Sequence, residues 1–211
     1  MKFLYKYSRI ILYPIVFLAN ILQNKFTSFF TPMNMGPVSD DSYSSFIKQN
    51  INKNDFVLDF GSGAVFFSKL FSHKKYLGVE INKNFVKISK KNNPDYEFKI
   101  LKNDYLKGCE KKIDIIFINN VLHHLTDNQI NNTITYFKKK LKKKTKFLII
   151  EPLFPKTFFS LEFLMKVVDI GDNIKSQKGY LRLLNKILKI NKYYVKKVGI
   201  GSVLIIKGCI N

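Results

Sequence analysis

The sequence predicts an α/β fold, a doubly wound and mostly parallel seven-stranded sheet that ends in a C-terminal antiparallel hairpin. Short β-rich runs alternate with longer helical runs from about residue 41 onward, which is typical of a parallel sheet with helices on both faces. Residues 115–118 are all apolar, as expected of a central strand that is buried on both sides. Two β-rich runs around Gly199-Ile200-Gly201 form the expected hairpin.

Each element follows from a local pattern. The polar residues at 40–42 can cap a helix that reaches about Gln49, and Asn92-Asn93-Pro94 ends a later helix because proline cannot continue one. Ile130, Ile134 and Phe137 give another helix one apolar face. We expect strands at 56–60, 76–81, 96–101, 113–119, 146–151, 193–198 and 202–207, helices at 41–49, 65–71, 83–91 and 128–142, and a mostly helical segment at 154–189.

The length of 211 residues suits one compact domain with a sizeable core. We expect that domain to occupy residues 41–211, after an apolar and basic helical extension at residues 1–40. Within the domain, residues 153–188 are expected to form a helical lid over the ligand pocket.

The first 22 residues combine basic and apolar side chains. Lys2, Lys6 and Arg9 precede the apolar run 10–19, which resembles a secretory signal, but the small residues of a cleavage site are missing. The run is also shorter than the roughly 20 apolar residues that span a bilayer. We expect a helix that packs on the domain, with an interfacial membrane anchor as the alternative.

The net charge of +21 raises the question of a nucleic-acid partner. Only Arg9 and Arg182 are arginines, and arginine is the residue that forks onto bases and phosphates. We therefore expect a solvated lysine surface, and the alternative is a weak attraction to anionic membranes or RNA.

The cysteine and histidine content predicts neither a disulfide framework nor a metal site. Cys109 and Cys209 are too few for such a framework, and the three histidines do not form a zinc signature with them. This usage fits a reducing, cytoplasmic environment.

The residues that could bind a ligand or take part in a reaction lie where the predicted strands end, which is where open parallel sheets bind ligands. Asp59 precedes a turn containing Gly61 and Gly63, whose backbone can approach a ligand closely. Glu80 ends the second strand, where a carboxylate can hold both hydroxyls of a ribose. Beyond the third strand, Asp104 can accept an adenine amine while Tyr105 covers the ring.

The glycine turn argues against the binding of a dinucleotide. Such sites expect G-x-G-x-x-G, whereas Phe66 stands at the third glycine position here. An acid directly before the turn would also repel a pyrophosphate, whereas it could accept hydrogen bonds from a cationic or amine-bearing ligand. We therefore expect Asp59 among the residues that bind the cofactor. A dinucleotide-dependent oxidoreductase, NAD(P) being the cofactor, stays an alternative, as does a non-catalytic scaffold.

The chain resembles the class I S-adenosylmethionine-dependent methyltransferases, which have a Rossmann-like fold. The matching segments are VLDFGSG at 57–63, LGVEI at 77–81, KND at 102–104 and IDIIFINNVLHHL at 113–125, within roughly residues 41–152. The resemblance implies that Gly61 and Gly63 pass under the methionine part of S-adenosylmethionine and that Glu80 holds the ribose. It also implies that Asp104 and Tyr105 hold the adenine and that Asn119 borders the sulfonium.

Two departures from the family pattern are visible. Val65 stands where a third glycine is frequent, which would reshape the loop near the methionine. Residues 143–145 replace a Pro-Gly-Gly turn, which changes a surface turn. Neither departure removes a side chain that the resemblance assigns to the cofactor.

His123 and His124 follow the fourth strand at the mouth of the expected site. A neutral histidine there could take a proton from an acceptor hydroxyl, whereas a structural role would have His124 cap or pack the next helix. Motifs of enzymes that methylate nucleobases or protein arginines are missing. The sequence therefore favours a small-molecule or lipid-like, amphiphilic acceptor.

Overall fold

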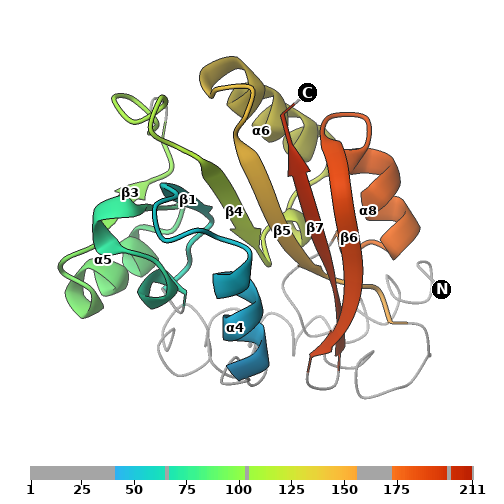
Figure 1. Cartoon of the computed structure of the whole chain (residues 1–211), viewed down its shortest axis with the longest axis horizontal. Helices are drawn as coiled ribbons and strands as arrows, with labels where there is room; N and C mark the ends of the chain where they lie inside the picture. The colour runs from blue at the N-terminus through green and yellow to red at the C-terminus, as the bar shows by residue number, and fades with distance from the viewer. Residues whose placement is uncertain (1–40, 65–66, 103–104, 156–172, 199–200, 211) are drawn as a thin grey trace, which may run out of the picture.

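The computed structural model describes residues 41–64, 67–102, 105–155, 173–198 and 201–210. In these ranges, seven strands form one sheet in the order β3-β2-β1-β4-β5-β7-β6 (Figure 1). Strands β1 to β5 are parallel to one another, and β7 pairs antiparallel with both β5 and β6. This arrangement confirms the predicted fold class. The strands are β1 (Val57–Phe60), β2 (Tyr76–Glu80), β3 (Glu97–Ile100), β4 (Ile115–Asn119), β5 (Lys146–Pro152), β6 (Lys189–Val198) and β7 (Gly201–Cys209).

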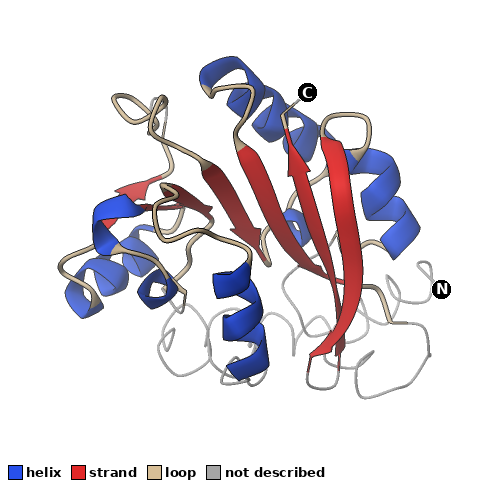
Figure 2. Ribbon diagram, in the orientation of Figure 1, coloured by secondary structure: helices blue, strands red, loops and turns tan. Residues whose placement is uncertain are grey.

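Helices cover the sheet from both sides (Figure 2). One face carries α6 (Asp127–Lys140) and α8 (Gln177–Leu184), which pack on the same apolar cluster. The other face carries α4 (Asp41–Gln49) and α5 (Lys83–Asn92). Three short 3-10 turns join these elements, namely η1 (Ser68–Leu70), η2 (His73–Lys75) and η3 (Leu122–His124).

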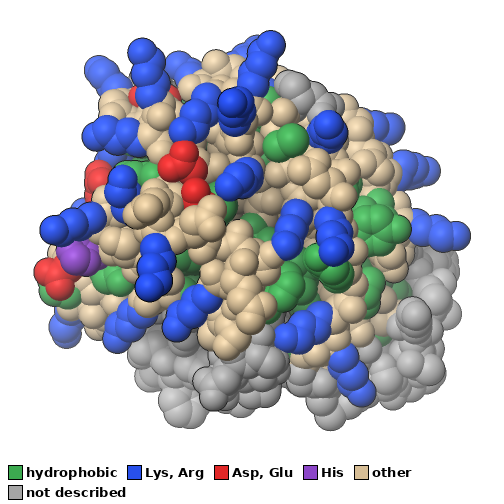
Figure 3. All heavy atoms as spheres, in the orientation of Figure 1, with side chains coloured by type: hydrophobic (Ala, Val, Ile, Leu, Met, Phe, Trp, Pro, Cys, Tyr) green, Lys and Arg blue, Asp and Glu red, His purple; other side chains and the backbone are tan. Residues whose placement is uncertain are grey.

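The surface of the described part is rich in lysine. Figure 3 shows Lys and Arg side chains distributed over the whole visible face, with few acidic side chains among them. No helix within the described ranges is both long enough and apolar enough to cross a membrane.

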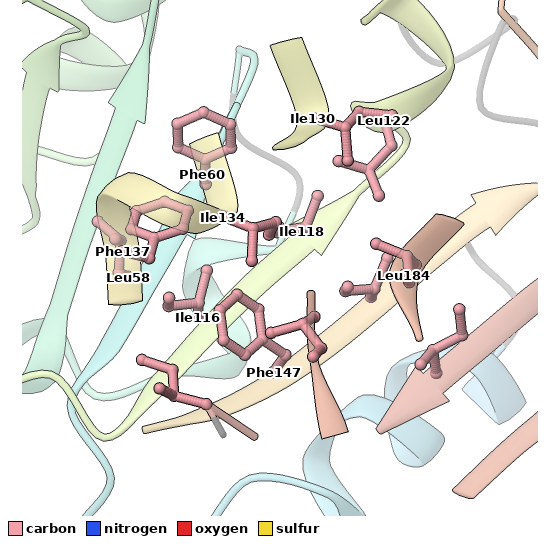
Figure 4. Packing of buried hydrophobic residues seen from close by; sticks show 14 of the residues in the cluster. Leu58, Phe60, Ile116, Ile118, Leu122, Ile130, Ile134, Phe137, Phe147 and Leu184 are labelled. Atoms are coloured by element: carbon pink, nitrogen blue, oxygen red, sulfur yellow. The ribbon is translucent and has the colours of Figure 1, made fainter. Parts of the chain in front are cut away.

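Alternating side chains of the central strands divide the core into two layers. On one face, Leu58, Ile116 and Phe147 meet the apolar side of α6 (Figure 4). On the other face, Val57 and Phe117 pack in a second cluster with residues of α4, α5 and η1. The central strands are therefore apolar on both sides because each side faces helices.

Helix α6 forms where the sequence predicts it, with better-defined ends. Thr126 is the N-cap, and its side chain and that of Gln129 form a reciprocal capping box. Ile130, Ile134 and Phe137 are fully buried, so the predicted apolar face is confirmed.

Two expected elements differ from the observed ones by more than one or two residues at an end. Strand β6 begins at Lys189 rather than 193, because Lys189 pairs with Cys209 across a bulge that the polar sequence does not reveal. In the segment 65–71, the described residues form only the short turn η1. The expected helical segment 154–189 contains α8, and residues 156–172 of it lie outside the described ranges, as does the extension 1–40.

Truncating the core face of α6 tests this packing. Ile134→Ala should lower the free energy of unfolding by about 2–5 kcal/mol, because it removes buried methyl groups and leaves a cavity. The neighbouring Thr135→Ala, on the exposed side of α6, should change it by less than about 0.5 kcal/mol. Urea unfolding of both variants measures the difference, and equal effects would contradict the described packing of α6.

Candidate active site

The predicted site residues lie together at the carboxyl ends of the parallel strands β1, β2, β4 and β5. Strands β1 and β4 are adjacent although β2 and β3 intervene in the chain, so the direction of strand order reverses between them. Such a reversal leaves a crevice between the segments that follow the two strands, and this is where open α/β sheets bind ligands.

The segment after β1 owes its shape to two glycines in left-handed backbone conformations. Gly61 has φ +77° and Gly63 has φ +61°. A Cβ at Gly61 would lie 2.5 Å from a methyl of Val121, so glycine lets this loop touch the segment after β4. Among the residues that the structure describes, a Cβ at Gly63 would meet no atom within 4 Å. The loop thus offers open space above Gly63, as a cradle for a bound molecule requires.

Glu80 fastens the glycine loop to the neighbouring strand. Its Oε2 accepts a hydrogen bond from the backbone N–H of Gly63 at 3.0 Å, and its Oε1 accepts one from Asn82 at 2.8 Å. The Ser89 hydroxyl of α5 donates to the carbonyl of Gly63 at 3.1 Å. The carboxylate is therefore held beside the open space, next to the start of α5.

Asp59 lies below the loop in the face that carries α4 and α5. Its Oδ2 accepts a hydrogen bond from the Tyr76 hydroxyl at 2.6 Å, and only 4% of the residue is exposed. Burial raises the pKa of Asp59 to about 7, although the bond from Tyr76 opposes the rise, and the nearby charge of Glu80 adds to it. In this structure the Asp59 carboxyl contacts Tyr76 inside the domain.

The segment after β4 makes a sharp turn. Asn119 is the buried last residue of β4, and Asn120 has a left-handed φ of 56°, which asparagine tolerates better than most residues. The N–H of Asn120 donates to the carbonyl of Ile150 at 2.9 Å. Turn η3 follows and brings Val121 against Gly61.

Glu151, near the end of β5, holds that turn from below. Its Oε1 accepts from the backbone N–H groups of Val121 and Leu122 at 2.8 and 2.7 Å. Its Oε2 lies 3.2 Å from the backbone N of His123 and 2.9 Å from His123 Nδ1. The side chain is 1% exposed. In the sequence, Glu151 is only the last residue of a predicted strand, although an acid that closes an apolar strand is a usable signal.

The two histidines differ in environment. His123 is 3% exposed and its carbonyl accepts from the N–H of Asn173 at 2.8 Å, whereas His124 is exposed. Their ring centroids are 4.0 Å apart. Because Thr126 caps α6, the expected capping role of His124 is taken by another residue.

The expected adenine end of the site is described in part. Asp104 lies outside the described residues. Tyr105 is half-buried and packs on Phe60 and Tyr136, with ring centroids 6.5 and 5.6 Å apart. Burial raises the pKa of the Tyr105 hydroxyl. In the described ranges, no group of three His, Cys, Asp or Glu side chains could hold a metal ion.

A family model described as a methyltransferase domain matches residues 58–149, which include β1, β2, β4, η3 and α6. The matched range contains the glycine loop, Glu80 and the turn at His123. The chain carries a class I S-adenosylmethionine-dependent methyltransferase domain. Enzymes of this class take S-adenosylmethionine as cofactor and transfer its methyl group. No curated protein matches the chain at the level of sequence.

Solved structures share the fold of this methyltransferase domain. The mitomycin 7-O-methyltransferase MmcR has a TM-score of 0.65 and 16% identity over 92% of this chain and 60% of its own. A SAM-dependent methyltransferase from Methanosarcina mazei has a TM-score of 0.62 and 15% identity over 78% and 96%. CalO1, a methyltransferase of calicheamicin biosynthesis solved with bound SAH, has a TM-score of 0.59 and 14% identity over 81% of this chain and 54% of its own. The chain thus spans little more than half of MmcR and CalO1.

The Glu151 contacts should be a large stabilising feature of the methyltransferase domain. Glu151→Ala leaves three N–H groups, two of them buried, and the His123 imidazole without this acceptor, at about 1–3 kcal/mol for each unsatisfied buried group. We expect a loss of at least about 3 kcal/mol in urea unfolding, and a smaller loss for Glu151→Gln, which keeps one acceptor oxygen. The control Glu97→Ala removes an exposed acid of β3. A Glu151→Ala variant as stable as this control would contradict the assigned role.

Asp59 should make stability depend on pH. The folded pKa of about 7 lies above the ordinary value of 3.8, so only the folded state keeps the proton between these values. Stability from this group is complete below about pH 4 and is lost as the pH rises toward 7. The side chain of the Asp59→Asn variant cannot titrate, so this variant should not lose that part of its stability. Between about pH 4 and 7 its free energy of unfolding, relative to that of the wild type, should therefore rise by a few kcal/mol. Parallel pH profiles of the two proteins would contradict the raised pKa.

Proposed function

We propose that the protein transfers the methyl group of S-adenosylmethionine to a small-molecule or lipid-like acceptor. The observation that carries the proposal is the Glu80 carboxylate, which is fixed beside the open space over Gly63 at the switch point of a methyltransferase domain. MmcR, a small-molecule O-methyltransferase by name, shares the fold and supports an acceptor of this kind.

The residues at the strand ends fit the cofactor in a consistent order. The left-handed glycines would pass under its methionine part, because no side chain projects from Gly63 into the open space. Glu80 would hold the ribose hydroxyls with the acceptor capacity left beside its two backbone bonds. Asn119 would border the sulfonium. Asp104 and Tyr105 would hold the adenine, and Asp59 would support the loop from within.

The cofactor supplies a methyl group that is already activated as a sulfonium, so the chain has to align the acceptor and exclude water. The buried turn at 120–124 suits both tasks because Glu151 fixes its backbone. The Glu151 carboxylate lies 2.9 Å from His123 Nδ1 and would orient the imidazole ring. His123, with His124 beside it, would take a proton from an acceptor hydroxyl.

The proposed setting is cytoplasmic and peripheral to a membrane. The apolar and basic segment 1–22 would contact the bilayer, and the segment 153–188 would cover the acceptor. The described end of the segment 153–188 contains α8, which begins after the N-cap residue Ser176. The preceding residue, Lys175, forms an ion pair with Asp127 of α6, in which Nζ and Oδ1 are 3.0 Å apart. This ion pair would anchor the covering segment on α6.

Calorimetric titration of the purified protein tests the cofactor assignment. S-adenosylmethionine and S-adenosylhomocysteine should bind in the micromolar range and NAD should not. Glu80→Ala should weaken both by at least about tenfold, because a charged hydrogen-bonding group contributes about 1.5–3 kcal/mol. The control Glu97→Ala should bind like the wild type.

Two results would overturn the proposal. The first is that folded wild-type protein binds neither adenosyl ligand, which would exclude S-adenosylmethionine as the ligand of the site. Tight binding of NAD in the same experiment would favour a dinucleotide-dependent enzyme. If binding holds, labelled methyl donor with polar and amphiphilic acceptor sets should label an extractable small molecule or lipid. Label found only on nucleic acid or protein would exclude the proposed acceptor class.

A further inference from the structure

The hairpin strands present a basic and aromatic surface on the side of the sheet that carries α4. Tyr194 of β6 lies edge-on to Phe46 of α4, with ring centroids 6.2 Å apart. The ammonium groups of Lys192 and Lys207 lie 5.0 and 5.8 Å from the Tyr194 ring centre, and that of Lys196 lies 6.0 Å from Phe46. These five residues are called the hairpin surface below. Figure 3, which views this side, shows lysine and apolar side chains together over β6 and β7.

The charge of this part of the chain is one-sided. After Asp172 the sequence contains nine of the 36 lysines and arginines and none of the 15 acids. Among the described residues, no carboxylate forms an ion pair with Lys192 or Lys207. Lys192 and Lys207 also face each other in the register of β6 and β7. Two cations at adjacent positions repel each other, so an anionic partner over them would relieve that repulsion.

Apolar groups accompany the charges. The two rings of the hairpin surface, Phe46 and Tyr194, are partly buried against the core, and they are the apolar groups that lie beneath its lysines. Lysines can lay their alkyl stems along such groups while the ammonium reaches outward. Tyrosine next to lysine is the combination that sits at the boundary between lipid headgroups and acyl chains.

We propose that the hairpin surface docks the protein onto an anionic lipid bilayer. Three features favour a bilayer over a nucleic acid as the partner, namely the lysines, the missing acids and the aromatic rings of Phe46 and Tyr194. The arginine of this region, Arg182, belongs to α8 on the opposite face, so the surface has no group for bidentate phosphate or base recognition. Lysines serve a bilayer as point charges in its negative surface potential.

The position of the surface links docking to the proposed active site. Lys196 of β6 pairs in register with Val203 of β7, and Val203 pairs with Pro152 at the carboxyl end of β5, where the proposed active site lies. Docking would therefore place the strand ends close to the headgroups. The proposal concerns binding alone and holds whichever acceptor the enzyme uses, so it stands independently of the proposed function.

Vesicle co-sedimentation of the full chain tests the proposal. The vesicles are pure phosphatidylcholine, or equal parts phosphatidylcholine and phosphatidylglycerol. The wild type should bind the anionic vesicles only, with binding that falls as salt rises. The double variant Lys192→Gln with Lys207→Gln should lower the partition coefficient on the order of tenfold, given about 1 kcal/mol per lysine near an anionic membrane.

A matched control separates the surface from net charge and from residues 1–22. Lys139→Gln with Lys140→Gln removes the same charge from exposed positions on α6, on the opposite face, and should reduce binding less than about twofold. Residues 1–22 are intact in both variants. Equal losses in the two variants, or no binding of wild type to anionic vesicles, would overturn the proposal. So would a hairpin variant that loses affinity for a single-stranded RNA but keeps its affinity for vesicles.

Discussion

The site depends on how the carboxyl ends of β4 and β5 satisfy their backbone groups. A parallel strand that stops leaves N–H groups of the following segment in a buried place without a ladder partner, and such groups need acceptors. Glu151 supplies them, because its two oxygens reach the backbone of residues 121, 122 and 123 and one ring nitrogen of His123. Without this carboxylate, the backbone N–H groups of residues 121, 122 and 123 would lose their acceptor.

A second carboxylate, Glu80, acts in the same way on the other side of the switch point. It accepts from Gly63 and Asn82, and so joins the loop after β1 to the end of β2. The two loops then meet directly, because Val121 lies against Gly61. Two acids, Glu80 on β2 and Glu151 on β5, thus fix the segments that follow β1 and β4. Ligand binding can use this preformed shape with little ordering of the backbone.

Much of this could be predicted from the sequence where local and global patterns agree. The apolar period of α6 and the glycines after β1 are each signals that neighbouring residues reinforce. The positions of Glu80 and Asn119 at strand ends followed from the strand pattern alone. Their assignment to a cofactor followed from the family resemblance, and the methyltransferase family model matches the same segments.

The remainder depended on contacts between distant segments. Nothing local in the run 189–192 signals a strand, because β6 starts there only to pair with β7. The role of Glu151 requires knowing that β4 and β5 are neighbours, which places positions 28 to 30 residues apart in contact. Likewise, Asp59 was expected at the ligand, while the structure pairs it with Tyr76, since alternation in β1 directs its side chain toward the α4 and α5 face.

The contact between Gly61 and Val121 also constrains how the protein can evolve. Any side chain at position 61 meets Val121, and it must also adopt a left-handed backbone that L-residues avoid. A smaller residue at position 121 would relieve the first penalty and leave the second, so no single compensating change opens position 61 to variation. Position 61 is thus constrained twice, by its neighbour and by its own backbone, and substitution at position 121 cannot free it.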